Sequence, residues 1–181
     1  MLETKRLLLR AWREEDVEPF IRHTNTRAVM RWLGGVRGEA QVREMLIGKF
    51  NRWLDERGFT FWAVERRADG ELLGFCGLKI ADDAGTQVEG LHEVGWRFRE
   101  DVWGQGYAKE AAIDSLDFAF GQTGAEQVVA LTIISNEPSW GLMERLGMTR
   151  RPDLDYEGAE WAETPVIVYA VRKDQWLART S

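Results

Sequence analysis

The chain has 181 residues, 44% of them hydrophobic and 30% charged, which provides the apolar material of one ordinary globular core and predicts a single domain over residues 1–181. A formal net charge of −6 argues against a nucleic-acid partner, because duplex binding depends on clustered Lys and Arg side chains. The single cysteine, Cys76, excludes an internal disulfide and a thiolate metal cluster, so we expect no metal and a reducing, cytoplasmic location. No apolar run reaches membrane-spanning length and the first ten residues are rich in charge, so we expect no signal peptide and no membrane partner.

The first half of the chain alternates between strand and helix patterns. Residues 6–12 read as a strand, and residues 14–23 as a short helix. A longer amphipathic helix is predicted over residues 39–57, where the apolar positions recur at three- and four-residue spacing until Gly58 ends the pattern. Residues 60–66 and 72–80 then predict an antiparallel hairpin around an Asp-Gly turn.

A period-two pattern marks the next strand, residues 91–98. One set of side chains consists of His92, Val94, Trp96 and Phe98, and the other of Glu93, Gly95 and Arg97. A glycine inside a strand is typical of a bulge or of a place where a ligand or another backbone approaches closely. Gly95 therefore predicts a local irregularity in this strand.

The second half continues the alternation. Helical spacing runs from Ala108 to Gly121, and an almost continuously apolar stretch over residues 127–134 predicts a strand buried on both faces. Asn136 is placed as the N-cap of a short helix that Gly147 closes, and residues 164–172 form a last strand before a tail over residues 173–181. The order indicates a mixed α/β fold.

The glycine loop at Gly104 and Gly106 lies between a strand and a helix. Backbone N–H groups at a helix start are unpaired and partly positive, so a loop without side chains can hold a pyrophosphate there, although such glycines are also common in plain turns. A dinucleotide-binding fingerprint would need a small residue where Lys109 stands, and the Gly-Lys-Ser/Thr ending of a P-loop is missing. Dehydrogenase and kinase interpretations are therefore set aside.

Two motifs resemble one known family. EVGW at residues 93–96 with VWGQGYAKEA at 102–111 resembles the acyl-CoA-binding signature of the GCN5-related N-acetyltransferase (GNAT) family, in particular its ribosomal-protein and small-molecule branch. NEPS at 136–139 with MERLGM at 143–148 is similar to the family's Asn-x-x-Ser helix and its closing sequence. The hairpin residues 60–64 and 74–78 also resemble the family, so the likeness covers nearly the whole chain in the same order.

The resemblance implies a fold and a coenzyme site. The fold is a mixed, mostly antiparallel central sheet, splayed between two strands and flanked by helices. The co-substrate is acetyl-CoA without a metal, and its pantetheine arm pairs with the splayed strand like an additional strand. The implied coenzyme-binding residues are Val94, Trp96, Phe98, Trp103, Gly104, Gln105, Gly106, Tyr107, Ala108, Lys109, Asn136 and Ser139.

The implied chemistry is transfer of an acetyl group to a primary amine, either a protein N-terminus or a small-molecule amine, by direct attack in a ternary complex. An unpaired N–H near residues 94–96 would stabilise the oxyanion. Glu93 is the candidate base, although a carboxylate on a strand can equally be a solvated surface group. Where many members have an acidic tyrosine this chain has Met143, so Ser139, water or the product would protonate the leaving thiolate.

Aromatic side chains supply the candidates for the acceptor pocket. The sequence holds nine tryptophans, and Trp32 and Trp62 are candidates to hold a cationic acceptor, with core packing as the alternative. The protein is expected to be a monomer or a homodimer. A catalytically silent acyl-CoA-binding module is the alternative function, supported by the missing tyrosine at Met143.

Overall fold

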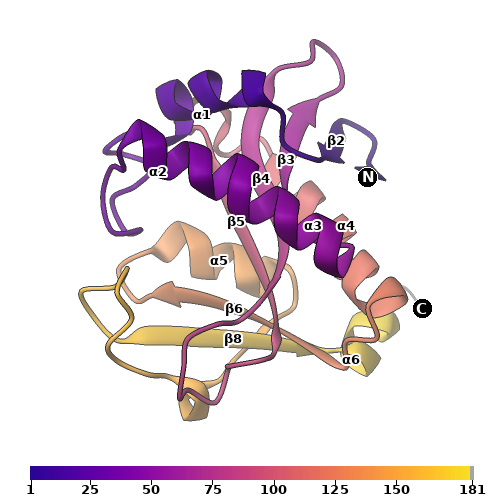
Figure 1. Cartoon of the computed structure of the whole chain (residues 1–181). Helices are drawn as coiled ribbons and strands as arrows, with labels where there is room; N and C mark the ends of the chain where they lie inside the picture. The colour runs from indigo at the N-terminus through magenta and orange to yellow at the C-terminus, as the bar shows by residue number, and fades with distance from the viewer. Residues whose placement is uncertain (180–181) are drawn as a thin grey trace.

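The computed structural model describes residues 1–179, which form one eight-stranded sheet with the strand order β1-β2-β3-β4-β5-β6-β8-β7 (Figure 1). Every neighbouring pair is antiparallel except β5 and β6. The predicted mixed, mostly antiparallel sheet is thus confirmed. The strands are β1 (Leu2–Glu3), β2 (Leu7–Arg10), β3 (Phe61–Arg66), β4 (Leu72–Ile80), β5 (His92–Phe98), β6 (Gln127–Ile133), β7 (Thr149–Arg150) and β8 (Val166–Arg172).

The helices lie close to their predicted places. A 3-10 turn, Glu14–Asp16, leads into α1 (Val17–Thr24). The long predicted helix is continuous but changes winding, with α2 (Glu39–Arg43), a π-helical segment (Glu44–Phe50) and α3 (Asn51–Arg57). It ends at Gly58, whose φ of 77° is the left-handed conformation that glycine adopts without strain. The later helices are α4 (Tyr107–Gln122), α5 (Glu137–Arg145) and α6 (Lys173–Ala178), with 3-10 turns at Glu100–Val102 and Pro152–Leu154.

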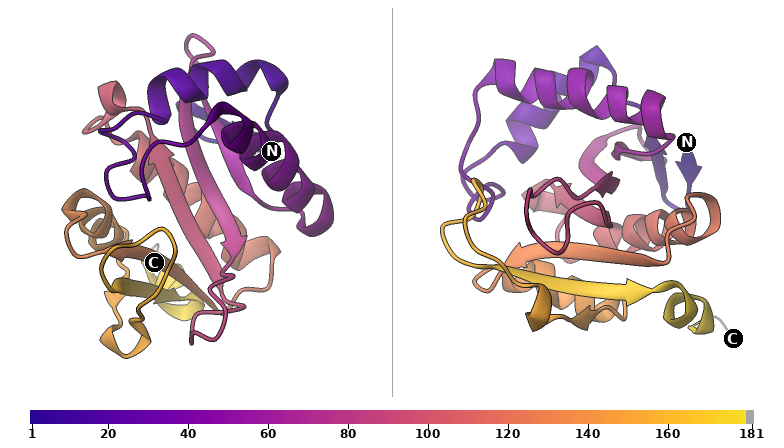
Figure 2. Two further views of the ribbon diagram at one scale, coloured as in Figure 1. Left: turned by 60° about the vertical axis from the view of Figure 1, so that its left-hand side comes forward. Right: turned by 60° about the horizontal axis from the view of Figure 1, so that its bottom comes forward.

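The strands β2 to β5 lie between two helical layers. On one face α1 to α3 pack on the sheet through an aromatic cluster that includes Phe20, Phe50, Phe61 and Phe75. On the other face α4 presents small residues such as Ala111 and Ala112, which let the helix approach β4 and β5 closely. In the right-hand view of Figure 2 the long helix runs along the top of the molecule, and β6 and β8 run along the bottom.

The C-terminal segment departs from the prediction. Instead of a plain tail, residues Lys173–Ala178 form α6, and Trp176 is only 1% exposed. The Trp176 indole N–H donates to Asp117 Oδ1 of α4 at 2.7 Å, and its ring packs near Phe120. Residues 180 and 181 of the predicted tail lie outside the described residues. Burial of one large aromatic residue therefore docks the end of the chain on α4.

The central pair β5 and β6 opens along its length. Their parallel pairing joins only His92 with Val128 and Glu93 with Val129, although each strand continues beyond these residues. On its other side β5 pairs with β4 without interruption from His92 to Phe98. The second half of β5 therefore has one free edge inside the sheet. None of the helices in residues 1–179 is long and apolar enough to cross a membrane.

Candidate functional site

The free edge of β5 exposes alternate backbone amides. The Arg99 N–H donates to Leu73 O at 2.9 Å, which makes residues 99 and 73 a hydrogen-bonded pair of the β4–β5 ladder. Because hydrogen-bonded pairs alternate in an antiparallel ladder, Arg97 and Gly95 also direct their amides to β4. Trp96 and Phe98 then direct theirs to the opposite side, beyond the last residue that pairs with β6. The edge can accept an extended ligand as an additional strand.

The glycine loop lies immediately after this edge. Gly104 and Gly106 have φ values of 74° and 81°, and Gly106 is the N-cap of α4. Among the residues that the structure describes, none accepts a hydrogen bond from the amides of residues 104–109. A run of free N–H groups at the start of a 16-residue helix fits an anionic diphosphate.

Arg6 holds the loop in place. Its Nε donates to Glu110 Oε2 at 2.6 Å, and its Nη1 donates to the carbonyl of Gln105 at 3.1 Å. The guanidinium also lies 4.3 Å from the centre of the Tyr107 ring. A side chain from the turn between β1 and β2 thus fixes the loop and adds positive charge beside it, a role that no local pattern in the sequence indicated.

Glu93 is buried on the face of the sheet that α1 to α3 cover. The residue is 9% exposed, and its Oε2 lies 3.3 Å from Lys79 Nζ without making a hydrogen bond to any of residues 1–179. Burial raises the pKa of Glu93 to about 7, and the positive charge of Lys79 only partly opposes this. A carboxyl group with such a pKa can accept a proton from an amine near neutral pH.

Besides Lys79, three polar groups lie near Glu93, namely Asp82, Asp83 and Tyr156. Lys79 contacts Asp82 at 2.6 Å as well as Glu93, and the charges of Asp82 and Asp83 act on both Glu93 and Tyr156. The Tyr156 hydroxyl is buried and has no hydrogen-bond partner in the part of the chain that the structure describes. Burial and the nearby acidic groups raise the pKa of Tyr156. This corner of the site is therefore acidic and favours a cationic amine.

The start of α5 carries the second group of predicted coenzyme residues. Asn136 occupies the N-cap position, but its side chain makes no capping hydrogen bond; its carbonyl accepts from the Ser139 N–H at 3.1 Å. The Asn136 amide and the half-buried Ser139 are thus free to meet a ligand. Met143 is 1% exposed in the core and can donate no proton.

The predicted tryptophans lie in different environments. Trp103 is 48% exposed beside the glycine loop, and its indole N–H donates to Phe98 O at 2.9 Å. Trp32 is half-buried, with the Arg31 guanidinium 5.1 Å from the centre of its ring. Trp62 is 1% exposed and packs edge-on against Phe118 of α4, on the face of the sheet opposite Glu93. Its position favours core packing over contact with an acceptor.

Gly95 is explained by packing rather than by a bulge. The register of β4 and β5 is continuous through Gly95, which lies opposite Gly77. A Cβ on Gly95 would lie 2.9 Å from the edge of the Phe61 ring, so the ring occupies the space of the missing side chain. Of the two alternatives, the bulge is absent from the β4–β5 pairing, and a close approach is present but comes from a side chain.

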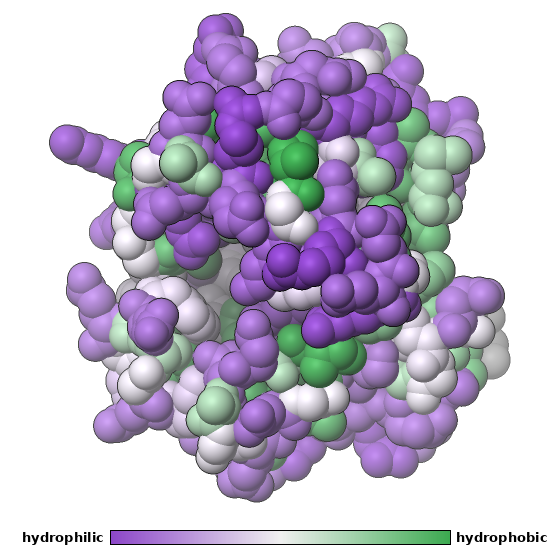
Figure 3. Space-filling view, viewed as in Figure 1, coloured by the Kyte–Doolittle hydropathy of each residue, from purple (hydrophilic) through white to green (hydrophobic). Residues whose placement is uncertain are grey.

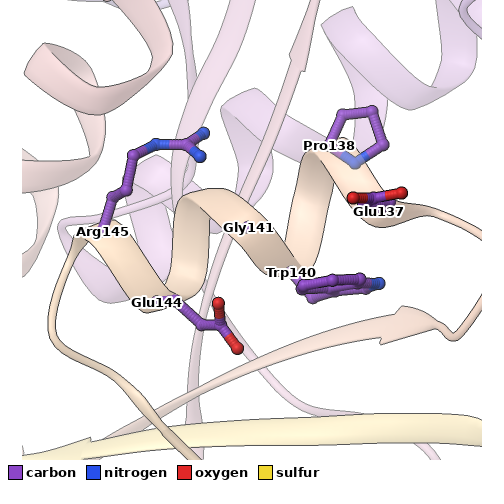
Figure 4. A pocket seen from close by; sticks show the side chains of 6 residues that line it. All are labelled: Glu137, Pro138, Trp140, Gly141, Glu144 and Arg145. Atoms are coloured by element: carbon purple, nitrogen blue, oxygen red, sulfur yellow. The ribbon is translucent and has the colours of Figure 1, made fainter.

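The surface of the molecule is hollowed between its two halves. Figure 3 shows this hollow left of centre, with the α1–α3 half above it and the α5, β6 and β8 half below. A separate, open groove lies along α5 itself (Figure 4) and is lined by Glu137, Pro138, Trp140, Gly141, Glu144 and Arg145. Neither Glu93 nor the glycine loop lines that groove.

Comparisons with known proteins agree with this geometry. Residues 6–149 match the family model described as acetyltransferase (GNAT) domain. The chain is 32% identical over 150 residues to the uncharacterized protein YkkB of Bacillus subtilis, covering 81% of this chain and 84% of the relative. It is 25% identical to the uncharacterized N-acetyltransferase p20 of Bacillus licheniformis, covering 97% of both chains.

Two solved structures share the fold. RimL, a ribosomal L7/L12 α-N-protein acetyltransferase in complex with coenzyme A, superposes with a TM-score of 0.74 at 18% identity, covering 93% of this chain and 95% of RimL. Spermidine N-acetyltransferase from Vibrio cholerae, in complex with coenzyme A and spermine, superposes with a TM-score of 0.72 at 16% identity, covering 96% of this chain and 99% of that enzyme. The solved structures show the shared fold, and the family match over most of the chain defines an acetyl-CoA-dependent acyltransferase. The chain belongs to the GNAT family of acetyltransferases and carries out acetyl-CoA-dependent N-acetylation in general.

Proposed function

We propose that this protein transfers the acetyl group of acetyl-CoA directly to a primary amine, with both substrates bound at once. The observation that carries the proposal is the parting of β5 from β6 directly after Glu93, which places a free strand edge beside a buried carboxyl group of raised pKa. The acetyl donor and the proton acceptor that the reaction needs then meet at one point of the sheet.

The coenzyme follows the free amides from the loop to the strand. Its diphosphate binds the N–H groups of residues 104–109, and its pantetheine arm runs along the edge of β5 toward Glu93. Trp103, Lys109, Asn136 and Ser139 border this path. The thioester carbonyl accepts a hydrogen bond from the Trp96 amide, which stabilises the oxyanion that forms when the amine attacks.

Glu93 removes the proton that the amine loses on attack. Its carboxylate form predominates above a pH of about 7, and the neighbouring Lys79 offers a positive charge that stabilises this form. Ser139 or water returns a proton to the leaving thiolate, because Met143 has none to donate. The surrounding Asp82, Asp83 and Tyr156 attract the incoming amine in its cationic form. The amine loses one proton to solvent before its lone pair attacks, and Glu93 takes the second proton on attack.

The test is release of free thiol from acetyl-CoA in the presence of separate acceptors. The panel contains peptides with free α-amines, linear polyamines, amino acids and simple alkylamines. We expect turnover with at least one class and formation of the N-acetyl product by mass spectrometry. Tight coenzyme binding without turnover on any acceptor would favour a catalytically silent acyl-CoA-binding module instead.

A further inference from the structure

Among the arginines that the structure describes, two are buried, and their environments differ. Arg10, 6% exposed, donates to both carboxylate oxygens of Asp16 at 2.7 and 2.8 Å and to Glu65 at 2.7 Å. A buried cation is stable in a protein when it is paired and hydrogen-bonded in this way. Arg10 therefore shows how this fold accommodates a structural arginine.

Arg97 has no such partners. It is 8% exposed, and its Nε and Nη1 atoms are buried without a hydrogen-bond partner among residues 1–179. The side chain lies over the rings of Phe75 and Phe20, with its guanidinium carbon 5.1 and 5.9 Å from the ring centres. Burial, together with the positive charge of Arg37, lowers the pKa of Arg97 to about 9.

Arg37 also has no carboxylate partner. Its guanidinium contacts Met45 Sδ at 3.4 Å, and no carboxylate in the described part of the chain pairs with either arginine. In a protein of net charge −6, acidic partners are abundant, and most other arginines have one. The two unpaired cations thus form a basic corner on the side of the sheet that α1 to α3 cover.

The basic corner belongs to the same face as Glu93. Glu93, Gly95 and Arg97 alternate with the residues that face α4, so all three lie on one side of β5. Arg97 and Glu93 are four residues apart, which corresponds to about 13 Å along an extended strand. The acidic corner and the basic corner are therefore at opposite ends of one stretch of β5, next to the proposed path of the coenzyme.

We propose that Arg97, aided by the charge of Arg37, binds an anionic group of the carboxylate class on the acceptor while the acceptor's amine lies at Glu93. This inference rests on the proposed function and adds the substrate class to it. None of the guanidinium nitrogens of Arg97 makes a hydrogen bond within residues 1–179, so its Nε–Nη2 edge or its Nη1–Nη2 edge can bind the two oxygens of a carboxylate in a bidentate manner. The acceptor is then an elongated amino acid whose reacting amine and carboxylate are several bonds apart.

A purely structural role explains less of the geometry. The contacts with the rings of Phe75 and Phe20 leave the donors Nε and Nη1 without hydrogen-bond partners in residues 1–179. Methionine would fill the same space without a buried charge. The unused donors are available to an anion that residues 1–179 do not supply.

The experiment compares matched acceptors in wild type, Arg97→Met and Arg97→Lys. Each pair consists of an ω-amino acid and its primary amide, which keeps the amine and the length but removes the negative charge. We expect the kcat/KM of wild type to be about tenfold or more higher for the acid than for the amide. The amide loses the charge-assisted hydrogen bonds to Arg97, and the loss of one such bond is enough to lower affinity by about tenfold. Arg97→Met removes the preference, and Arg97→Lys retains part of it.

Binding is measured without turnover as well. In the presence of coenzyme A, the acid and not the amide raises the melting temperature of wild type, and this shift is absent in Arg97→Met. Arg172→Met, an exposed arginine at the α6 end of β8, serves as the control for loss of one positive charge and keeps both the preference and the shift. The melting temperature of ligand-free Arg97→Met equals or exceeds that of wild type, because a buried unpaired cation has been removed.

Three outcomes would overturn the inference. One is equal use of acid and amide by wild type. Another is a higher KM for acetyl-CoA in Arg97→Met with an unchanged acceptor preference, which would assign the anion to a phosphate of the coenzyme. The third is a melting temperature several degrees below that of wild type with an unchanged preference, which would assign Arg97 to the core. Absence of turnover on every acceptor would refute the proposed transfer reaction, while the binding shift would still test Arg97.

Discussion

At the scale of single residues, the chemistry of the site depends on the burial of a few charged side chains. Glu93 and Arg97 face the same apolar layer. Burial raises the pKa of Glu93 and lowers the pKa of Arg97, because each charged form loses contact with water. Arg10 is as deeply buried but is paired with Asp16 and Glu65. Arg10 therefore supports the fold, whereas Glu93 and Arg97 are the buried charges that we propose act on the substrate.

Replacing Glu93 with Gln should change activity in a pH-dependent manner. In wild type, kcat/KM falls about tenfold per pH unit below a pH of about 7, where the carboxylate becomes protonated. Glu93→Gln should lower kcat at neutral pH by about 10²-fold and remove this limb of the profile, while coenzyme affinity measured by calorimetry stays nearly unchanged. Glu126→Gln, an exposed change in the loop before β6, is the control. A wild-type pH profile in Glu93→Gln would remove Glu93 from the role of base.

The same substitution should change the pH dependence of stability. The pKa of Glu93 is about 7 in the folded protein, against about 4.3 for an unfolded Glu side chain. Between these values the folded state binds the proton more tightly, so Glu93 lowers the free energy of unfolding progressively as pH rises from about 4.3 to 7. Glu93→Gln should flatten the dependence of the free energy of unfolding on pH between these two values, as measured by urea denaturation. Above a pH of about 7 the variant should be more stable than wild type. An identical pH dependence in both proteins would contradict the raised pKa.

At the scale of elements, the segment from β5 through the glycine loop to α4 forms the proposed coenzyme site. The left-handed φ values of Gly104 and Gly106 direct the chain into the helix and leave the amides of residues 104–109 free within the described structure. Arg6, from the other end of the chain, holds this arrangement. The proposed site is therefore assembled from a local sequence motif and one distant contact.

Gly106→Val should abolish the stabilisation that coenzyme A gives to the protein. A β-branched side chain cannot adopt the φ of 81° without strain and would cover the amides of the loop. For wild type at 100 times Kd we expect a gain of about 2.7 kcal/mol, or about 5–10 °C in melting temperature. Differential scanning fluorimetry with and without coenzyme A measures the difference.

Gly121→Ala in α4 is the matched control for that substitution. A Cβ there meets no atom within 4 Å, and the backbone is helical. Alanine should stabilise α4 by about 0.5–1 kcal/mol and leave the shift caused by coenzyme A intact. A full shift in Gly106→Val would place the diphosphate elsewhere.

At the scale of the whole molecule, the opening between β5 and β6 joins the two halves of the protein at the site. The layer of α1 to α3 lies in the N-terminal half, and α5 and β6 lie in the C-terminal half (Figure 1). The N-terminal half contributes Glu93 and Arg97 of β5 to the site, and the C-terminal half contributes Tyr156. Since the pairing of β5 with β6 stops at Glu93 and Val129, the rest of this edge of β5 is free for the coenzyme in the proposed reaction. The separation of β5 from β6 after Glu93 is thus a feature of the fold itself.

Hydrogen exchange should report on this opening. In the free protein the amides of Trp96 and Phe98 exchange quickly, because they have no strand partner beyond Glu93. Coenzyme A should slow exchange at these residues and at residues 104–109, and leave the amides of Val168 and Ala170 in β8 unchanged. Site-resolved exchange by NMR makes the comparison. Unaltered exchange along β5 in the saturated protein would show that the coenzyme does not follow this edge.

The sequence determined the helices and strands of this protein and the glycine loop that we propose binds the coenzyme. Apolar periods of two and 3.6 residues specify strands and helices locally, and Gly104, Gly106 and the residues around them carry the loop motif in ten consecutive positions. Only the tertiary structure decided that Gly95 makes room for Phe61 and that Trp176 draws the last segment into a helix on α4. It also decided that Glu93 and Arg97 are buried, and that the Nε and Nη1 atoms of Arg97 have no hydrogen-bond partner in residues 1–179. The physical reason is that burial and pairing arise from contacts between segments distant in the chain, whereas helix and strand periods depend only on neighbours.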